Sequence, residues 1–278
     1  MKIGMLMIAS EFTHSSPISY EMMDCLSNCG FEVVPFIPEH QLIDIGQIKV
    51  DCDLYILRPS SENILSIAGI LHSKGARILN SYPACSVVRD KVQVAARLLD
   101  AGLPFPKSYV TGNIAYLKDT LRTSVIVKHE RGANGEDITI IDKHQPSPKP
   151  RKGGYFVQQF LESEKKDIKL YVIGNQVMAR CRNFPPKDHS EFYGSECKLT
   201  DRMRELALAC GEIFDLEIYG LDCVQIQDEL FIVDVNYFPS FLGVPHAGKM
   251  LADYIYKYAL RSEANIVKYP SGSFTLQS

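Results

Sequence analysis

The first ninety residues alternate short apolar runs with longer stretches in which apolar residues recur at helical spacing. The apolar runs predict strands at 2–9, 31–37, 53–59 and 76–80, and the helical spacing predicts helices at 16–30 and 64–75. Strands that alternate regularly with helices are typical of a parallel sheet covered by helices. We therefore expect an N-terminal parallel α/β lobe.

A further helix is predicted at 89–102, where Val92, Ala95, Leu98 and Leu99 form an apolar stripe. It should end at Gly102, and the prolines in 103–109 exclude its continuation and favour an extended connector. We place a lobe boundary in this region.

Beyond residue 124 the pattern changes to hairpins. A hairpin should turn at Gly174 and Asn175, and a helix should follow Thr200, whose hydroxyl suits an N-cap. The strands are predicted at 124–128, 138–142, 155–161, 168–182, 220–226 and 229–235, and the helices at 200–214 and 249–260. The expected fold is α/β with α+β lobes: an N-terminal lobe at 1–88, a small antiparallel central lobe at 89–168 and a C-terminal α+β lobe at 169–278.

Composition narrows the class of partner. The chain has 278 residues, a net charge of −3 and a pI near 6.2, so it has no general attraction for nucleic acid or for anionic membranes. No apolar run reaches the roughly 18 residues of a membrane span. The eight cysteines form no C-x-x-C pair, and we expect reduced thiols. These features indicate a cytoplasmic protein with a small-molecule substrate, no nucleic-acid partner and no membrane partner, and they leave homo-oligomerisation open.

The stretch "FIVDVNYFPS" places Asp234 and Asn236 two residues apart at the end of a hydrophobic strand. Residues two apart in a strand project from the same face, and Asp222 on the preceding strand could lie opposite them. Three oxygen donors suit Mg²⁺, which also keeps water and phosphate oxygens as ligands. The alternative is that both residues bond the backbone of a turn.

Glycines and lysines on the N-terminal side of this stretch suit phosphate binding. Gly132 and Gly135 lie in the loop 129–137, whose backbone amides could close over phosphates. Lys128 ends the strand that enters the loop, and Lys91 begins a helix. Each feature alone also fits a plain hairpin loop or a solvated surface lysine.

Taken together and in this order, these residues make the segment from about Ser81 to Leu260 resemble the ATP-grasp superfamily. The segment 81–109 looks like the ribosomal protein S6 modification (RimK-type) ligases. By contrast, "IKLYVIG" and "DVNYFPSF" look most like the inositol trisphosphate 5/6-kinases of the same superfamily.

The resemblance implies a role for each matching residue. Lys91 and Lys128 would hold the α- and β-phosphates of ATP, and Asp167 would approach the ribose. The adenine would lie against Gln158, Gln159, Phe160 and Leu161, with Gln159 standing where glutamate is commoner. Asp222, Asp234 and Asn236 would bind Mg²⁺, with Mn²⁺ as a substitute.

Lys169 and Arg182 match basic positions that face the transferred phosphoryl group, so the resemblance implies that they are catalytic. Fixed cations placed where charge accumulates are the main protein contribution to this chemistry. Without the family context, an exposed ion pair and a sheet-edge arginine explain them equally well. Arg58 matches a substrate-binding position of the first lobe, and Arg131 is a second basic residue available to an anionic substrate.

Two enzymatic reactions fit this pattern, and the nucleotide site does not separate them. One joins a carboxylate to an amine through an acyl-phosphate, and we favour it narrowly because of the match in 81–109. Against it, the Arg/Asn/Gly-Gly segment of the ligases is replaced by Tyr193-Gly194-Ser195. The alternative is a kinase that phosphorylates a polyol phosphate. A non-catalytic ATP-binding module is a third hypothesis, which the presence of all three expected metal ligands disfavours.

Overall fold

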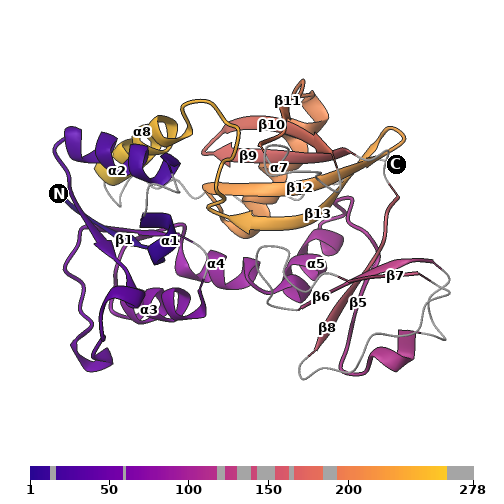
Figure 1. Ribbon diagram of the computed structural model, residues 1–278, viewed down its shortest axis with the longest axis horizontal. Coiled ribbons are helices and arrows are strands. Elements are labelled where there is room, and N and C mark those ends of the chain that lie inside the picture. Colours follow the sequence, from indigo (N-terminus) through magenta and orange to yellow (C-terminus); the bar gives the residue numbers. More distant parts are fainter. Residues whose placement is uncertain are drawn as a thin grey trace.

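The computed structural model describes residues 1–12, 17–58, 61–117, 123–129, 139–142, 154–162, 166–183 and 193–261. Their strands form three sheets, which Figure 1 shows at the left, at the top and at the lower right. Mixed parallel and antiparallel sheets confirm the expected fold class.

The N-terminal sheet is parallel throughout, in the order β2-β1-β3-β4, as expected. Strand β1 ends at Leu6, earlier than predicted, because a short helix starts at Ala9. The elements of this part are β1 (Lys2–Leu6), α1 (Ala9–Phe12), α2 (Pro17–Asn28), β2 (Glu32–Phe36), the 3₁₀ turns η1 (Pro38–His40) and η2 (Ile45–Gln47), β3 (Leu54–Leu57), α3 (Glu62–Ser73) and β4 (Ile78–Leu79).

Two helices occupy the region after this sheet. Helix α4 (Tyr82–Val88) is capped by Ser81, and α5 spans Lys91–Asp100. The Asp90 carboxylate accepts hydrogen bonds from the backbone N–H groups of Val92 and Gln93, which starts α5 at Lys91. Lys91 therefore begins a helix, as the sequence predicts.

The central sheet is antiparallel, in the order β5-β8-β6-β7. Its strands are β5 (Ser108–Thr111), β6 (Val125–His129), β7 (Thr139–Ile141) and β8 (Tyr155–Gln159), and the 3₁₀ turn η3 (Ile114–Tyr116) follows β5. The sequence did not predict β5, which begins at Ser108, within the stretch expected to be an extended connector. This sheet has a small core of its own, formed by Ile114, Val125, Val127, Tyr155 and Val157.

The C-terminal sheet is antiparallel and follows the order β11-β10-β9-β12-β13. The β9–β10 hairpin turns at Gly174 and Asn175, and the Thr200 hydroxyl caps α7, both as predicted. The elements are β9 (Lys166–Ile173), β10 (Gln176–Asn183), β11 (Ser195–Glu196), α7 (Asp201–Phe214), β12 (Ile218–Ile226), β13 (Glu229–Tyr237) and α8 (Ala247–Leu260). The expected boundary at 168/169 falls within β9, and the division into three lobes stays a prediction.

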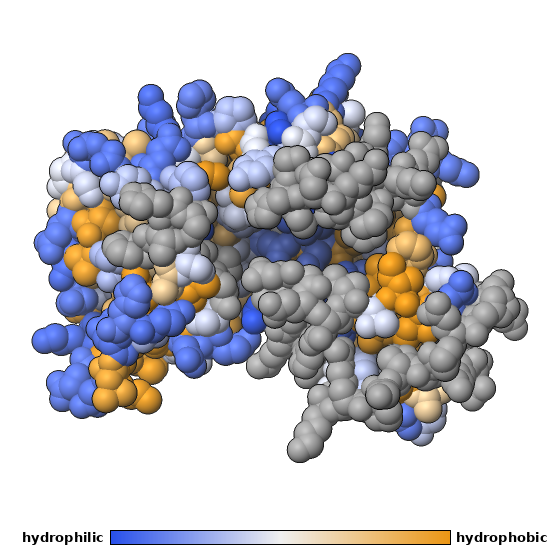
Figure 2. Space-filling view, viewed as in Figure 1, coloured by the Kyte–Doolittle hydropathy of each residue, from blue (hydrophilic) through white to orange (hydrophobic). Residues whose placement is uncertain are grey.

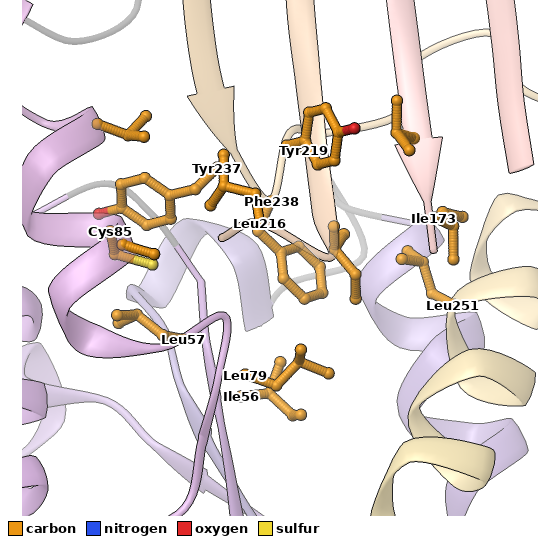
Figure 3. Packing of buried hydrophobic residues seen from close by; sticks show 14 of the residues in the cluster. Ile56, Leu57, Leu79, Cys85, Ile173, Leu216, Tyr219, Tyr237, Phe238 and Leu251 are labelled. Carbon is orange, nitrogen blue, oxygen red and sulfur yellow. The ribbon is translucent and has the colours of Figure 1, made fainter. Parts of the chain in front are cut away.

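The N-terminal and C-terminal sheets share one hydrophobic core. Figure 3 shows Phe238, which follows β13, above Leu79 of the N-terminal sheet, with Leu251 of α8 nearby. The buried amide of Asn80 donates to the Ile218 carbonyl at 2.7 Å and accepts from the backbone N–H of Glu217 at 2.8 Å. These contacts join the two sheets into one packed unit.

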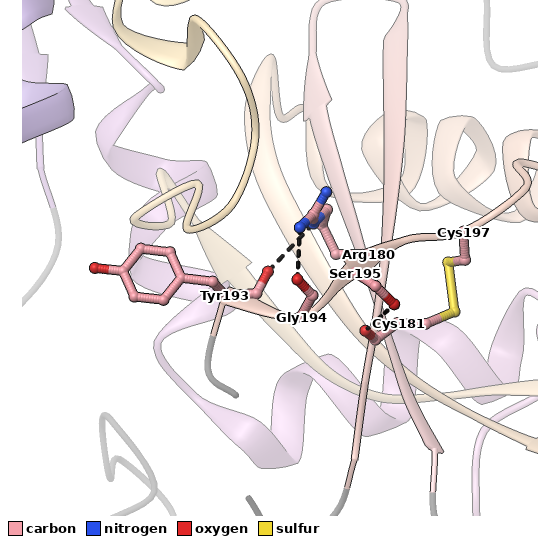
Figure 4. Close-up of a disulfide and its surroundings, with 6 residues drawn as sticks. All are labelled: Arg180, Cys181, Tyr193, Gly194, Ser195 and Cys197. Atoms are coloured by element: carbon pink, nitrogen blue, oxygen red, sulfur yellow. Dashed lines mark hydrogen bonds between the residues drawn. A yellow bond between two sulfur atoms is a disulfide. The ribbon is translucent and has the colours of Figure 1, made fainter. Parts of the chain in front are cut away.

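The expectation of reduced thiols is wrong for two cysteines. Cys181 and Cys197 form a disulfide with a Cα–Cα distance of 5.6 Å (Figure 4). Strand β11 pairs with β10, which brings Cys197 beside Cys181 although 16 positions separate them in the sequence. No short spacing motif reveals such a pair.

In the part of the chain that is described, no helix has both the length and the apolar character that a membrane span needs.

Candidate active site

One face of the C-terminal sheet carries most of the residues selected from the sequence. In an antiparallel pair, residues directly opposite each other project to the same side. Lys169 on β9 stands opposite Asp222 on β12, which in turn stands opposite Asp234 on β13. Ile168 and Leu170 alternate with Lys169 and lie in the core, so a shift of one residue would bury the charged side chains. The apolar alternation therefore fixes the polar face.

Asp222 is the centre of a cluster that also contains Lys169, Arg182 and Asn236, and we call it the Asp222 cluster. Lys169 Nζ lies 2.9 Å from Asp222 Oδ1, and Arg182 Nη2 lies 3.4 Å from the same oxygen. The side-chain amide of Asn236 donates to Asp222 Oδ2 at 3.1 Å. Three other predicted site residues therefore meet at the Asp222 carboxylate.

Electrostatics within this cluster shift two pKa values. Burial alone would lower the pKa of Lys169, but Asp222 and Tyr171 together hold that pKa above its usual value. Asp167 stands opposite Arg182, and its carboxylate lies 3.7 Å from Arg182 Nε. Burial raises the pKa of the Asp167 carboxyl to about 6, although Arg182 acts in the other direction. Lys169 is thus a fixed cation, while the Asp167 carboxyl has a pKa near 6.

A second pair of cations approaches from the other side of the site. Lys91 Nζ, at the first residue of α5, lies 2.9 Å from Asp234 Oδ1. Lys128 on β6 is only 7% exposed and donates to Gln158 Oε1 at 2.9 Å and to the Val233 carbonyl at 3.1 Å. Burial lowers the pKa of Lys128. Burial alone would raise the pKa of Asp234, but Lys91 and Lys128 together leave it below its usual value.

The expected adenine-binding residues lie where β8 ends. Gln158 is 1% exposed, and its Nε2 has no hydrogen-bond partner among the described residues. The backbone N–H groups of Gln159 and Phe160 donate to the carbonyls of Lys107 and Ser124, which fixes the strand end between its neighbours. Strand β8 ends at Gln159, and the chain continues through Phe160 and Leu161. All three residues are half-buried. Their contact with adenine stays a prediction.

Arg58 packs against the segment that follows β13. Arg58 follows β3, is 3% exposed and stacks over the Phe238 ring at 4.7 Å from its centroid. Its substrate-binding role also stays a prediction. The remaining predicted residues, Arg131, Gly132 and Gly135, lie outside the described residues, together with most of the expected phosphate-binding loop.

The donor chemistry at β12 and β13 fits Mg²⁺. Asp222, Asp234 and Asn236 supply two carboxylates and one amide from adjacent strands, and hard oxygen donors of this kind are what Mg²⁺ prefers. Among the described residues, no group of three or more His, Cys, Asp or Glu side chains could hold a metal. A metal here therefore depends on Asn236 and on oxygens from a ligand or water.

Residues that the sequence did not select support this face. Phe238 and Phe241 follow β13, are fully buried and have positive φ angles of 45° and 52°, which are unusual for aromatic residues. The Tyr171 ring stacks on Phe241 with centroids 5.1 Å apart. Arg180 shares the face of Lys169, which stands opposite it in the hairpin register. Lys169 and Arg180 lie at equal distances before and after the turn at Gly174 and Asn175, so the sequence could have paired them.

A hollow lies near the middle of the molecular face shown in Figure 2, in the region that β13 and α5 occupy in Figure 1. Its visible floor is hydrophilic. Lys91 on α5 pairs with Asp234 on β13, so these two elements approach each other.

A family model described as the RimK-like ATP-grasp domain matches residues 88–255, which is more than half of the chain. The chain belongs to the RimK-like ATP-grasp family. The matched range contains every predicted site residue except Arg58. A probable alpha-L-glutamate ligase from Haemophilus influenzae is 26% identical over 191 residues, 63% of this chain and 63% of the relative. The match thus spans less than two thirds of that relative.

Solved structures confirm the fold. A RimK domain ATP-grasp protein from Sphaerobacter thermophilus has a TM-score of 0.70 at 16% identity, over 92% of this chain and 100% of that one. The D-alanine–D-alanine ligase from Bacillus anthracis, solved in complex with ATP, has a TM-score of 0.70 at 17% identity, over 94% and 97%. The kinase alternative finds no support among these relatives, because those named for a reaction are ligases.

Proposed function

We propose that this protein is a Mg-ATP-dependent ligase that joins a carboxylate to an amine through an acyl-phosphate. The observation that carries the proposal is the meeting of Lys169, Arg182 and Asn236 at Asp222, beside the Lys91–Asp234 ion pair. Membership of the RimK-like family supports ATP as the co-substrate.

The cations of the site suit the phosphates of ATP. Lys91 and Lys128 would hold the α- and β-phosphates, and Asp167 would hold the ribose. The adenine would lie against Gln158, Gln159, Phe160 and Leu161. Asp222, Asp234 and Asn236 would hold Mg²⁺, which draws negative charge from the phosphate oxygens when it is bound.

The reaction then needs positioning and charge stabilisation rather than a protein nucleophile. An oxygen of the substrate carboxylate attacks the γ-phosphorus of ATP, and ADP leaves. The amine next attacks the carbonyl carbon, and phosphate leaves with the former carboxylate oxygen and the proton that the amine gives up. Lys169 and Arg182 would stabilise the negative charge that develops on the transferred phosphoryl group.

The substrate class follows from the relatives rather than from the site. The relative from Haemophilus influenzae is named for glutamate, and this chain covers 63% of its length. We therefore propose an amino acid, with glutamate as the first candidate, as one of the two substrates. Arg58 and Arg131 are the predicted residues for its anionic groups.

The fate of the γ-phosphate tests the proposal. The protein is incubated with Mg-ATP and pairs of carboxylates and amines, with L-glutamate in each role. We expect ADP, free phosphate and an amide in equal amounts, no ADP when the carboxylate is omitted, and no repeated turnover of ATP when the amine is omitted. A phosphorylated product that retains the phosphate would instead establish a kinase, and binding without cleavage would establish a non-catalytic module.

A further inference from the structure

Arg180 is a cation on the candidate active face that none of the expected roles uses. It lies on β10, directly opposite Lys169 on β9, so both side chains project from the same face of the sheet. Strand β10 is one position further than β9 from β12 and β13, which carry Asp222 and Asp234. The backbone of Arg180 therefore lies about one strand spacing, about 4.8 Å, beyond that of Lys169.

The backbone of the adjacent chain holds Arg180 along one edge of its guanidinium group. Nε donates to the Tyr193 carbonyl at 3.2 Å and Nη2 donates to the Gly194 carbonyl at 2.6 Å (Figure 4). Gly243 packs against the same group, and a Cβ there would lie 3.0 Å from both Nε and Nη2 and would collide with the Tyr193 carbonyl. Arg180 is thus oriented, while Nη1 takes part in neither of these hydrogen bonds.

The charge of Arg180 is not neutralised by an ion pair in the described residues, in contrast to its neighbours. Lys169 pairs with Asp222, and Arg182 pairs with Asp167 and Asp222. Glu196 stands opposite Arg180 in the register of β10 and β11, but no ion pair joins them. Two carbonyl oxygens satisfy hydrogen bonds without cancelling a full positive charge.

We propose that Arg180 binds a substrate carboxylate that takes no part in bond formation and so selects substrates with this group. The inference rests on the proposed ligase function. An oriented guanidinium suits a planar carboxylate, because its N–H groups can pair with both oxygens. Arg182 on the same strand reaches Asp222, whereas the Tyr193 and Gly194 carbonyls hold Arg180, which places this carboxylate beside the phosphoryl group rather than on it.

The carboxylate can belong to either substrate. An amino acid that serves as the amine carries one carboxylate, and a dicarboxylate that serves as the carboxylate donor carries a second. Hydroxylamine separates the two sources, because it replaces the amine and traps the acyl-phosphate as a hydroxamate.

Equilibrium binding tests the inference apart from turnover. Calorimetry on the protein with Mg-ADP compares L-glutamate, L-aspartate and succinate with the monoamides L-glutamine and L-isoglutamine. The variants are Arg180→Gln, Arg180→Lys and the control Arg202→Gln, which changes a largely exposed arginine on α7. We expect Arg180→Gln to weaken binding of at least one carboxylate probe roughly 10- to 100-fold, with partial recovery in Arg180→Lys and no change in the control. The monoamide that lacks the recognised carboxylate should bind the wild type and Arg180→Gln equally.

If no carboxylate probe binds the wild type more tightly than Arg180→Gln, the proposal is wrong. In steady state, Arg180→Gln should raise KM for the carboxylate-bearing substrate while kcat and the KM for ATP change less than about threefold. A fall in kcat with a matching rise in the KM for ATP would show that Arg180 only holds the Tyr193–Gly194 backbone. With hydroxylamine in place of the amine, the KM for the carboxylate donor is compared between Arg180→Gln and wild type. A raised KM in the variant shows that the recognised carboxylate belongs to the donor, and an unchanged KM shows that it belongs to the amine.

The two proposals fail in different ways. Arg180-dependent binding without ATP cleavage would reject the ligase and keep the carboxylate site. Amide formation with the same substrate KM values and the same carboxylate binding in wild type and Arg180→Gln would keep the ligase and reject the site.

Discussion

The ammonium group of Lys169 lies 2.9 Å from Oδ1 of Asp222, its direct neighbour across β9 and β12. Arg182 approaches the same oxygen at 3.4 Å. Adjacent cations repel unless an anion lies between them, and in this structure the anion is a carboxylate. We expect that a phosphate oxygen takes part in the same arrangement when nucleotide binds.

Replacing Lys169 by Met removes one fixed cation from this arrangement. We expect kcat to fall by roughly two to three orders of magnitude, the scale seen when one preorganised stabiliser of transition-state charge is lost. Steady-state kinetics of amide formation measure the effect, and Lys257→Met on the exposed face of α8 is the matched control. A twofold change or less would mean that Lys169 is only a structural ion-pair partner of Asp222.

Replacing Asp234 by Asn removes an anionic oxygen donor from β13 and the ion-pair partner of Lys91. We expect turnover to fall at least about 100-fold, because a bound metal stabilises transition-state charge by several kcal/mol. Adenosine binding should be largely retained, because Gln159, Phe160 and Leu161 are unchanged. Calorimetry with adenosine, beside kinetics with Mg-ATP, separates the two effects, and Asp253→Asn on α8 is the control. Near-normal turnover would remove Asp234 from the metal site.

Asp167 should make stability depend on pH. Its pKa is about 6 in the folded protein against an ordinary value of 3.8, so its contribution to stability is complete below about pH 4 and is lost as the pH rises through 6. In Asp167→Asn the side-chain amide does not titrate, so the variant does not lose this stability as the pH rises. The free energy of unfolding of the variant relative to wild type should therefore rise between pH 4 and pH 7.5, by up to about 3 kcal/mol at about 1.4 kcal/mol per pKa unit. Urea titrations at both values, without nucleotide or metal, measure the difference, and an equal difference at both would contradict the raised pKa.

Most of the fold could be predicted from the sequence, because its strands alternate clearly and its helices carry caps. The turn at Gly174 and Asn175 sets the register that places Lys169 opposite Arg180. Strand β5 was missed because Pro104 and Pro106 precede it and mask its start. The Cys181–Cys197 pair was missed because it depends on the pairing of β10 with the very short β11.

The candidate site could be predicted only in part, for a physical reason. Types and spacing of residues indicate which side chains share a strand face, and Asp234 and Asn236 were found in this way. Pairing between distant segments depends on tertiary packing, and Lys91 with Asp234 is such a pair. The approach of Lys128 to the Val233 carbonyl and of Arg180 to the Tyr193 carbonyl involves backbone atoms, which no side-chain pattern reveals.

The most direct test of the proposed function follows an oxygen atom from the carboxylate substrate to phosphate. The protein is incubated with Mg-ATP, an amine and a carboxylate labelled with ¹⁸O, using L-glutamate first, and the released phosphate is analysed by mass spectrometry. A ligase that forms an acyl-phosphate transfers one ¹⁸O atom to each phosphate, because the attacking carboxylate oxygen leaves with the phosphoryl group. Phosphate free of ¹⁸O, formed together with the amide, would contradict the acyl-phosphate mechanism.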